Sequence, residues 1–358
     1  MALSHLESEL TFNFPPHAED KHILKTLERF VFEAASEKAI YFGIKDFYLE
    51  KNLRIRAEFD PENGNPIKTI LCKKGEHNGR GREESETIIE DTLVKFFEGN
   101  SQLTVVKHRF VFTFKNHPKW KNVGVVIDHV ESPIKMKRVE IEAIDDPDII
   151  DEIQKIPFLK SWKRETRPSW VYFKRKIGIA GPPSSGKTTV ARAFVNFLSV
   201  TYGATVEYVN EYARTHIARY GVPHWYVQPL IMWSQDRREN DSSTYPMFVT
   251  DSPKFLAYIY ALFNRTGNLD DEAIYILSKL YKASLYAAKD YSDLILLTPK
   301  SVKAEGIRYQ DDNDAEALYS MMKGFLFNHD INFIECDYNH ALEELAYEIF
   351  NLNKVEDE

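Results

Sequence analysis

Cysteines, long apolar runs and an excess of positive charge are scarce or missing in this sequence. Only two cysteines, Cys72 and Cys336, occur in 358 residues, and their wide separation favours neither a disulfide framework nor a cysteine-based metal site. No apolar run approaches the roughly 18 residues that a membrane-spanning helix needs. The net charge of −8 argues against a general nucleic-acid coat, and residues 1–10 lack a basic-then-apolar signal pattern. We therefore expect a cytoplasmic protein without a membrane span.

The apolar content is sufficient for more than one hydrophobic core. Apolar residues make up 43% of the chain and aromatic residues 13%, and the length allows two domains of ordinary size. Patterns of charge and periodicity change across residues 146–175, which are acidic first and then basic and aromatic. We expect a first domain over residues 1–145, a linker over 146–175 and a second domain over 176–358.

The strongest local motif is a phosphate loop that follows a short apolar run and precedes a helical pattern. Strand, loop and helix are the context that this motif requires. Its backbone N–H groups are expected to surround a β-phosphate at the helix N-terminus, with Lys187 at the β- and γ-phosphates and the Thr188 hydroxyl on Mg²⁺. The expected nucleotide-binding residues are Gly181, Pro182, Pro183, Ser184, Ser185, Gly186, Lys187, Thr188 and Thr189.

Alternating short strands and helices predict a parallel α/β sheet around this loop. The candidate strands are residues 176–180, 205–209, 246–250, 294–297 and 332–335. Ligands bind beyond the carboxyl ends of such strands. Glu211 is placed to hold or deprotonate a substrate hydroxyl, Arg214 to bind phosphate, and Asp251 to order Mg²⁺ or act as a base. The alternatives are a helix-dipole role for Glu211 and a helix cap for Asp251.

The polar, cationic segment 299–308 suggests a mobile lid. Such a lid would bring Arg308 onto the transferring phosphoryl group. A solvated loop is the alternative interpretation.

The first domain shows a different periodicity, with charged residues at every second position of short strands. The anionic pairs are Glu7/Glu9, Glu84/Glu86 and Glu140/Glu142, and the cationic pairs are Arg54/Arg56 and Lys107/Arg109; Lys73, Arg82 and Asp128 are further charged strand residues. Because successive side chains point to opposite faces of a strand, each charged pair lies on one face and the apolar residues lie on the other. This pattern fits a barrel with an ionic interior that holds polyphosphate and a divalent metal, or an ordinary antiparallel sheet with a solvated charged face.

This ordered series resembles the CYTH family of triphosphate tunnel metalloenzymes and favours the barrel. The resemblance implies that the carboxylates of Glu7, Glu9, Glu84, Glu86, Asp128, Glu140 and Glu142 bind metal, and that Arg54, Arg56, Lys73, Arg82, Lys107 and Arg109 bind phosphate. The family opens with E-x-E-x-K, whereas this sequence has Thr11 where the lysine belongs. Thr11 puts one phosphate contact, and with it full hydrolytic competence, in question.

The second domain resembles the AAA-like kinase domain of the NadR group. The resemblance rests on three motifs: G-P-P-S-S-G-K-T, N-E-Y-A-R after the second predicted strand, and a later G-I-R. Some regulatory relatives join such a domain to a CYTH-like one, in the opposite order. The fold class is therefore an α+β antiparallel tunnel barrel followed by an α/β P-loop parallel sheet with helices on both faces.

The function implied by these two resemblances is bifunctional phosphate chemistry. It combines transfer from ATP or GTP to a nucleoside-like or polynucleotide hydroxyl with Mg²⁺- or Mn²⁺-dependent triphosphate binding or hydrolysis. A nucleotide-switched regulatory protein that binds polyanions or lipids is one alternative, and a ribosylnicotinamide kinase with a degenerate tunnel is another. No protein partner is indicated.

Overall fold

The computed structural model describes residues 3–23, 40–76, 82–98, 100–113, 123–144, 146–266, 270–299 and 312–354. Their contacts divide the chain into two compact units. The barrel unit comprises Met1–Phe173, Val200–Thr205 and Ala346–Glu358, and the P-loop unit comprises Lys174–Ser199 and Val206–Leu345.

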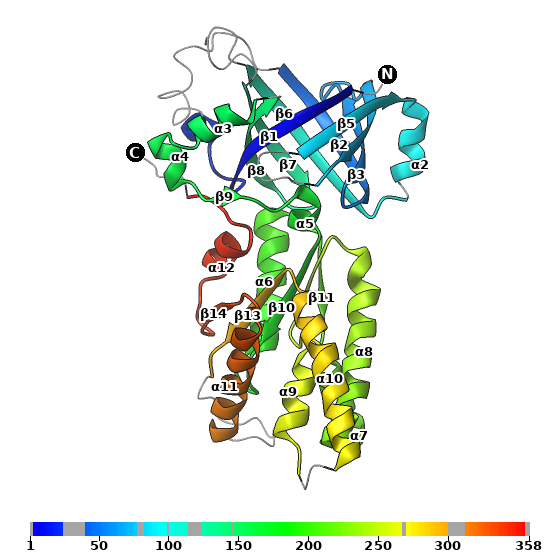
Figure 1. The fold of residues 1–358 in the computed structure, drawn as a ribbon, viewed down its shortest axis with the longest axis vertical. Helices are drawn as coiled ribbons and strands as arrows, with labels where there is room; N and C mark the ends of the chain where they lie inside the picture. The colour runs from blue at the N-terminus through cyan, green and yellow to red at the C-terminus, as the bar shows by residue number, and fades with distance from the viewer. Residues whose placement is uncertain are drawn as a thin grey trace. The chain divides into compact units, whose positions relative to one another are not determined.

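The barrel unit is built on antiparallel strands in the order β5-β4-β3-β2-β6-β7-β8-β1, and β1 also pairs with β5. This last pairing closes the sheet into a barrel (Figure 1) and confirms the predicted antiparallel tunnel architecture. The strands are β1 (Leu3–Phe14), β2 (Ile40–Glu50), β3 (Leu53–Phe59), β4 (Pro66–Lys74), β5 (Arg82–Ile89), β6 (Leu103–Thr113), β7 (Val123–Ser132) and β8 (Met136–Ile144).

Apolar side chains of these strands face outward from the barrel and form a core with nearby helices. On β1, Leu10, Phe12 and Phe14 alternate with polar residues and are almost completely buried. They belong to one cluster with Ile150 of α3 and Leu159 of α4. The helical elements of this part of the chain are η2 (Asp91–Leu93), α2 (Val94–Glu98), α3 (Pro147–Ile153), α4 (Pro157–Ser161) and α5 (Ser169–Phe173).

Residues 146–175, predicted as a linker, carry regular structure, and residues 146–173 belong to the barrel unit. Strand β9 (Arg164–Glu165) pairs with β1, which brings Glu165 opposite Thr11. The C-terminal residues join the same unit, because Asn353 Nδ2 donates to the backbone carbonyl of Asn13 at 3.1 Å. The barrel unit therefore contains segments from both ends of the chain, while the boundaries 1–145 and 176–358 stay predictions.

The P-loop unit contains a five-stranded parallel sheet in the order β11-β12-β10-β13-β14. Its strands are β10 (Arg175–Ala180), β11 (Val206–Val209), β12 (Met247–Thr250), β13 (Asp293–Leu297) and β14 (Ile334–Cys336). All five predicted strands are confirmed within two residues at each end. The helical elements along this half of the chain are α6 (Lys187–Tyr202), α7 (Tyr212–Tyr220), η3 (Trp225–Val227), α8 (Gln228–Asp241), η4 (Ser242–Thr244), α9 (Leu256–Phe263), α10 (Asp271–Lys289), α11 (Asp312–Asn328) and α12 (Leu342–Ile349).

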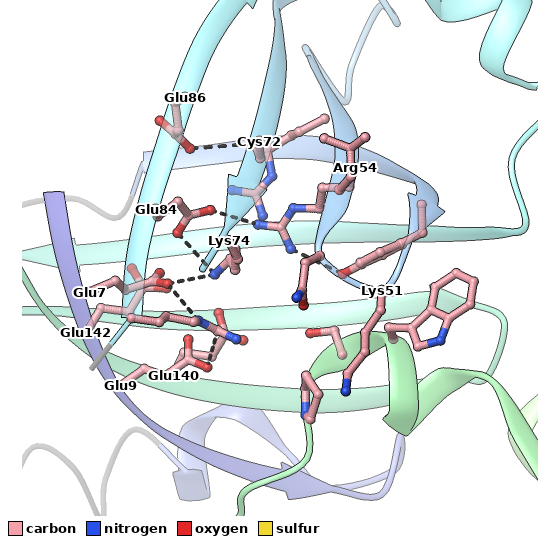
Figure 2. A pocket seen from close by; sticks show the side chains of 18 of the residues that line it. Glu7, Glu9, Lys51, Arg54, Cys72, Lys74, Glu84, Glu86, Glu140 and Glu142 are labelled. Carbon is pink, nitrogen blue, oxygen red and sulfur yellow. Dashed lines mark hydrogen bonds and ion pairs between the residues drawn. The ribbon is translucent and has the colours of Figure 1, made fainter. Parts of the chain in front are cut away.

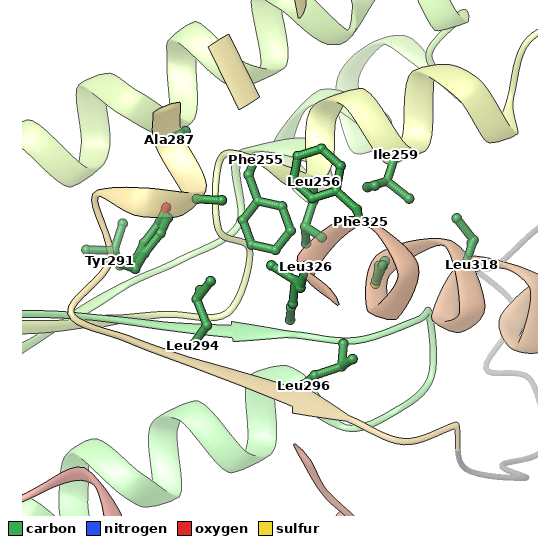
Figure 3. Packing of buried hydrophobic residues seen from close by; sticks show 14 of the residues in the cluster. Phe255, Leu256, Ile259, Ala287, Tyr291, Leu294, Leu296, Leu318, Phe325 and Leu326 are labelled. Atoms are coloured by element: carbon green, nitrogen blue, oxygen red, sulfur yellow. The ribbon is translucent and has the colours of Figure 1, made fainter. Parts of the chain in front are cut away.

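A continuous apolar core fixes three of these helices against the sheet (Figure 3). Leu294 and Leu296 of β13 are buried against Phe255 and Leu256 at the start of α9 and Leu326 of α11. Because burial of each such side chain contributes about 1.5–3 kcal/mol, this core holds the strand ends of the sheet in fixed positions. Among the described residues, no helix combines the length and apolar character needed to cross a bilayer.

Candidate functional site

The phosphate loop adopts a backbone conformation that its glycines permit. Gly186 has a φ of 87°, and a Cβ atom there would lie 2.3 Å from the Tyr338 ring. Gly181 has a φ of 156°, and a Cβ atom there would lie 2.8 Å from Ser185 Oγ. Side chains at these positions would strain the loop. The loop therefore leaves its backbone N–H groups at the N-terminus of α6, where an anion is favoured.

The two residues expected on phosphate and metal lie beside each other at the end of the loop. Lys187 Nζ donates to the backbone carbonyl of Pro182 at 2.8 Å. Thr188 Oγ1 donates to Asp251 Oδ2 at 2.5 Å, and the hydroxyl of Tyr208 donates to the same oxygen at 2.8 Å. The other Asp251 oxygen, Oδ1, is buried and has no hydrogen-bond partner among the described residues.

This arrangement separates the two interpretations of Asp251. Helix α9 begins at Leu256, with Phe255 at its N-cap, so Asp251 does not cap it. Instead Asp251 follows β12, which pairs with β10 directly before the phosphate loop. A carboxylate with one unpaired oxygen beside a threonine hydroxyl is an oxygen-donor set of the kind that Mg²⁺ uses, so these residues fit the ion.

Glu211 and Arg214 lie at the beginning of α7, close to the loop. Glu211 occupies the N-cap position, but its side chain makes no capping hydrogen bond. Its Oε2 lies 3.9 Å from Arg214 Nε, and Arg214 Nη2 donates to Thr188 Oγ1 at 3.3 Å. The structure therefore brings together Lys187, Thr188, Asp251 and Arg214, as the sheet topology predicted, and places Glu211 beside them. Arg308 lies outside the described residues.

A cavity of about 460 Å³ begins at this cluster and is lined mainly by apolar side chains. Glu211, Arg214, Thr188 and Lys187 line it near the loop. The remaining wall comes largely from α7, α8 and α9, and includes Ile217, Ala218, Pro223, Ile231, Met232, Leu256, Ala257 and Tyr260. Its volume lies in the range of small-molecule sites, and an apolar wall with a few polar groups at one end is typical of them.

The interior of the barrel is the second candidate site, a cavity of about 210 Å³ whose lining is dominated by charged side chains. Figure 2 shows that Glu7, Glu9, Glu140 and Glu142 gather on one side of it, while Arg54 and Lys74 point in from β3 and β4. The charged residues that line it are Glu7, Glu9, Lys51, Arg54, Arg56, Lys74, Arg82, Glu84, Glu86, Lys107, Arg109, Glu140 and Glu142. The charged faces are therefore internal, and the alternative of a solvated sheet is wrong.

One predicted tunnel residue is on the wrong face of its strand. Lys73 is exposed and does not line the cavity, whereas Lys74 does. Lys74 Nζ lies 2.6 Å from Glu7 Oε2 and 3.1 Å from Glu84 Oε2. The reason is the register between β3 and β4. Arg54 points inward from β3 and pairs with Cys72 of β4. Because side chains alternate along a strand, residues 72 and 74 also point inward and residue 73 points outward.

Many of the inward cations are paired with acids. Arg109 donates to both oxygens of Asp128 at 2.7 Å, and Lys107 Nζ lies 2.5 Å from Asp128 Oδ2. Asp128 is completely buried, and these bonds make it the counter-ion of two cations. Arg56 likewise donates to Asp46 at 2.9 Å. Sequence reasoning missed Asp46, because a lone aspartate in a strand gives no signal until its cross-strand partner Arg56 is known.

Three glutamates form the group that best fits a divalent cation. One carboxylate oxygen each from Glu7, Glu9 and Glu142 lies within 4.8 Å of the others. Burial raises the pKa of Glu142 to about 8, and the nearby carboxylates add to this rise. Burial would also raise the pKa of Glu7, but Lys74 and Arg82 lower it below its usual range. Concentrated carboxylate oxygens are the donors that Mg²⁺ and Mn²⁺ prefer, so the residues fit such an ion.

The other predicted metal ligands lie outside this group. Glu140 accepts from Arg109 and Arg138, each at 2.8 Å. Glu84 and Glu86 lie near Cys72 on the wall formed by β4 and β5, and Cys72 Sγ donates to Glu86 at 3.7 Å. On β5, Arg82 Nη2 donates to Glu9 at 2.7 Å. The structure therefore gathers Glu7, Glu9 and Glu142 and does not bring Asp128, Glu140, Glu84 or Glu86 into the same group.

Residues 176–344 match the family model of an AAA domain, which confirms the predicted P-loop domain. No curated protein matches the sequence. Among solved structures, a conserved hypothetical protein from Pyrococcus furiosus is 25% identical, with a TM-score of 0.31 over 42% of this chain and 88% of that one. The NadR protein in complex with NAD and AMP-PNP is 16% identical, with a TM-score of 0.40 over 59% of this chain and 60% of NadR.

A putative adenylate cyclase from Bacillus halodurans is 12% identical, with a TM-score of 0.31 over 46% of this chain and 95% of that one. The tunnel fold itself follows from the strand order and closure of the barrel, not from these partial overlaps. The chain thus joins a closed, charge-lined barrel to a P-loop unit whose residues 176–344 match the AAA-domain model.

Proposed function

We propose that the P-loop unit transfers the γ-phosphoryl group of ATP or GTP to a hydroxyl of a nucleoside-like or polynucleotide acceptor. We further propose that the barrel interior binds, or hydrolyses, a triphosphate together with Mg²⁺ or Mn²⁺. A bifunctional phosphate enzyme of this kind accounts for both charged sites within one chain.

The observation that carries the transferase assignment is that Thr188 and Glu211 line the phosphate-loop end of one largely apolar cavity, while Asp251 accepts a hydrogen bond from Thr188 directly behind it. Lys187 is released from the Pro182 carbonyl when a phosphate takes its place, and its charge then acts on the β- and γ-phosphates. Glu211 holds the acceptor hydroxyl and accepts its proton, while Arg214 neutralises charge that develops on the transferring group. The apolar wall excludes water, which favours transfer over hydrolysis.

The observation that carries the triphosphate assignment is the concentration of cations and carboxylates in the lining of the barrel cavity. Cations of β3, β4 and β6 surround the cavity, and the three-glutamate group lies at one side. When a triphosphate binds, its oxygens replace the carboxylates as the partners of these cations. The glutamate group, with the freed carboxylates, would hold the divalent ion, whose charge would neutralise the phosphate oxygens.

A radiolabelled-phosphate screen tests both assignments in the full chain. γ-Labelled ATP and GTP are offered with nucleosides, 5′-hydroxyl RNA and 5′-hydroxyl DNA, and tripolyphosphate hydrolysis is followed in parallel with Mg²⁺ and Mn²⁺. Acceptor-dependent label transfer supports the transferase. Label on nicotinamide riboside alone, with an inert tunnel, favours a ribosylnicotinamide kinase. Tight nucleotide binding without transfer to any acceptor favours a nucleotide-switched regulatory protein.

A further inference from the structure

Position 11 is the place where this tunnel departs from the charge pattern that its sequence otherwise follows. Thr11 is buried, with 2% of its surface exposed, and lies opposite Glu140 in the pairing of β1 with β8. Residues paired in this way share a face, with Cβ atoms about 4.5–5.5 Å apart. A lysine at position 11 would therefore lie directly across from Glu140, and a threonine leaves that carboxylate without a cation from β1.

The carboxylate of Glu140 nevertheless has a cation on each oxygen. Arg109 Nη2, from β6, donates to Oε2 at 2.8 Å. Arg138 Nε, from β8 itself, donates to Oε1 at 2.8 Å. Arg138 precedes Glu140 by two positions on the same strand, so both side chains point into the barrel. Arg138 pairs with Asn13 on β1, the next inward position after Thr11.

Arg138 is built into the wall as a buried charge. Only 3% of its surface is exposed, and its guanidinium carbon lies 5.9 Å from the centroid of the Tyr172 ring. Its Nη1 atom is buried and has no hydrogen-bond partner among the described residues. A buried guanidinium and a buried carboxylate each carry a large desolvation cost that pairing offsets. Removing Arg138 would therefore leave Glu140 with Arg109 as its remaining guanidinium partner.

We propose that Arg138 supplies the cation that the tunnel pattern expects at position 11, and that it acts as a positioning residue for Glu140. The inference rests on the proposed tunnel function. The positive charge thus lies on β8 instead of β1, on the same inward face and beside the same carboxylate, that of Glu140. Threonine at position 11 therefore leaves Glu140 with a cation on each carboxylate oxygen.

A charge-relocation cycle in the full-length chain tests this proposal. The parent, Arg138→Met, Thr11→Lys and the double variant are compared by calorimetric binding of tripolyphosphate in the presence of Mn²⁺, and by thermal unfolding. Loss of a partner that orients a ligand-binding carboxylate typically costs about 10- to 100-fold in affinity, and that loss is expected for Arg138→Met. We also expect its unfolding midpoint to fall by roughly 10 °C. Thr11→Lys alone is expected to change affinity less than about threefold, and the double variant to recover most of both losses.

The adjacent Lys137 provides a matched control. It lies on the outward face of β8 and its Nζ is 2.6 Å from Asp20. Lys137→Met is expected to leave tripolyphosphate affinity unchanged, and adding Thr11→Lys to it is expected to restore nothing. Equal losses from Lys137→Met and Arg138→Met, or a double variant no better than Arg138→Met, overturn the proposal.

A second cycle decides the case if a lysine at position 11 prevents folding. Arg138→Met is combined with Glu140→Gln, and the loss caused by Arg138→Met is expected to shrink at least tenfold in that background, because the carboxylate that it positions is gone. Additive losses overturn the inference. If the parent binds no tripolyphosphate, the tunnel function fails, and the unfolding midpoints of the same variants still decide whether Arg138 and position 11 substitute for each other.

Discussion

The cavity inside the barrel is lined mainly by charged side chains, whereas the larger cavity at the phosphate loop is lined mainly by apolar ones. In the barrel, buried acids such as Asp128 and Glu140 are matched by cations at 2.5–2.8 Å. At the phosphate loop, the charged groups stand at one end of an apolar wall. Under the proposed function, the first site would exchange ion pairs with a charged ligand, and breaking those pairs would also affect the fold. The second site would select its ligand by shape, and its few charged groups would act on the ligand.

The largest expected effect comes from breaking an ion pair in the barrel. Arg109→Met takes the guanidinium partner from the fully buried Asp128 and one of two guanidinium partners from Glu140. Uncompensated buried charge typically costs about 3–5 kcal/mol, and we expect a loss of that size in the free energy of unfolding measured with denaturant. The exposed pair Lys45–Glu98 provides the control, since Lys45→Met should cost less than about 1 kcal/mol. Equal effects of the two variants would show that the interior charges are solvated.

Removing the phosphate-loop lysine should impair phosphoryl transfer without reducing the stability of the fold. Lys187→Ala takes away a charge that acts on the nucleotide and not on the core, so phosphoryl transfer should fall about 100- to 1000-fold while the free energy of unfolding stays unchanged. Tripolyphosphate binding in the barrel should also be unaffected. Transfer assays and binding calorimetry on the same preparation check both statements, and undiminished transfer would contradict the assignment of the site.

Glu211, which lines the apolar cavity, and Asp251, which contacts Thr188, should have different roles in phosphoryl transfer. Glu211→Gln removes the group assigned to the acceptor hydroxyl, so transfer should fall about 100-fold with little change in nucleotide affinity. Asp251→Asn removes a charge beside Thr188 and should instead raise the Mg²⁺ concentration needed for half-maximal rate. Steady-state kinetics at varied Mg²⁺ and acceptor separates the two. If both variants lowered only the stability of the fold, and by the same amount, Glu211 and Asp251 would have structural roles.

The smallest expected effect sharpens the contrast between well-paired and poorly paired buried acids. Burial raises the pKa of Glu239 in α8 to about 7, although Tyr291 donates to it and Lys254 Nζ lies 3.9 Å from Oε2. Burial also acts on Glu140, but Arg138 and Arg109 keep the pKa of that carboxyl well below its usual range. The difference lies in the distance of the cation, 3.9 Å for Glu239 against 2.8 Å for Glu140.

The raised pKa of Glu239 predicts a pH dependence of stability. Between pH 4.5 and about 7 the folded chain keeps a proton on Glu239 that the unfolded chain releases, so stability falls as pH rises through this window. Glu239→Gln removes the effect and should raise the free energy of unfolding by about 1–3 kcal/mol at pH 8 but not at pH 4. Denaturant unfolding of parent and variant at both pH values measures the difference. A gain of equal size at the two pH values would assign it to packing instead.

Local sequence patterns predicted the elements of both units and much of the candidate site chemistry. The phosphate loop and the five strands of the parallel sheet were recognisable because loop, strand and helix signals lie within a few residues of one another. The positions of Glu211 and Asp251 followed from the rule that ligands meet the carboxyl ends of parallel strands. Side chains alternate strictly along a strand, so the sequence also placed Arg54 and Arg56 on one face of their strand and Glu7 and Glu9 on one face of theirs.

Only the tertiary structure decided which of these side chains meet. Choosing Lys74 over Lys73 depended on the register of β4 against β3, and a shift of one residue reverses every side chain. The ion pair of Asp46 with Arg56, the position of Thr11 opposite Glu140, and the attachment of Asn353 to β1 all join residues on different segments of the chain. Sequence periodicity determines which face a residue occupies. The energy of an ion pair depends on the distance between partners on different strands, and that distance is fixed only when the barrel closes.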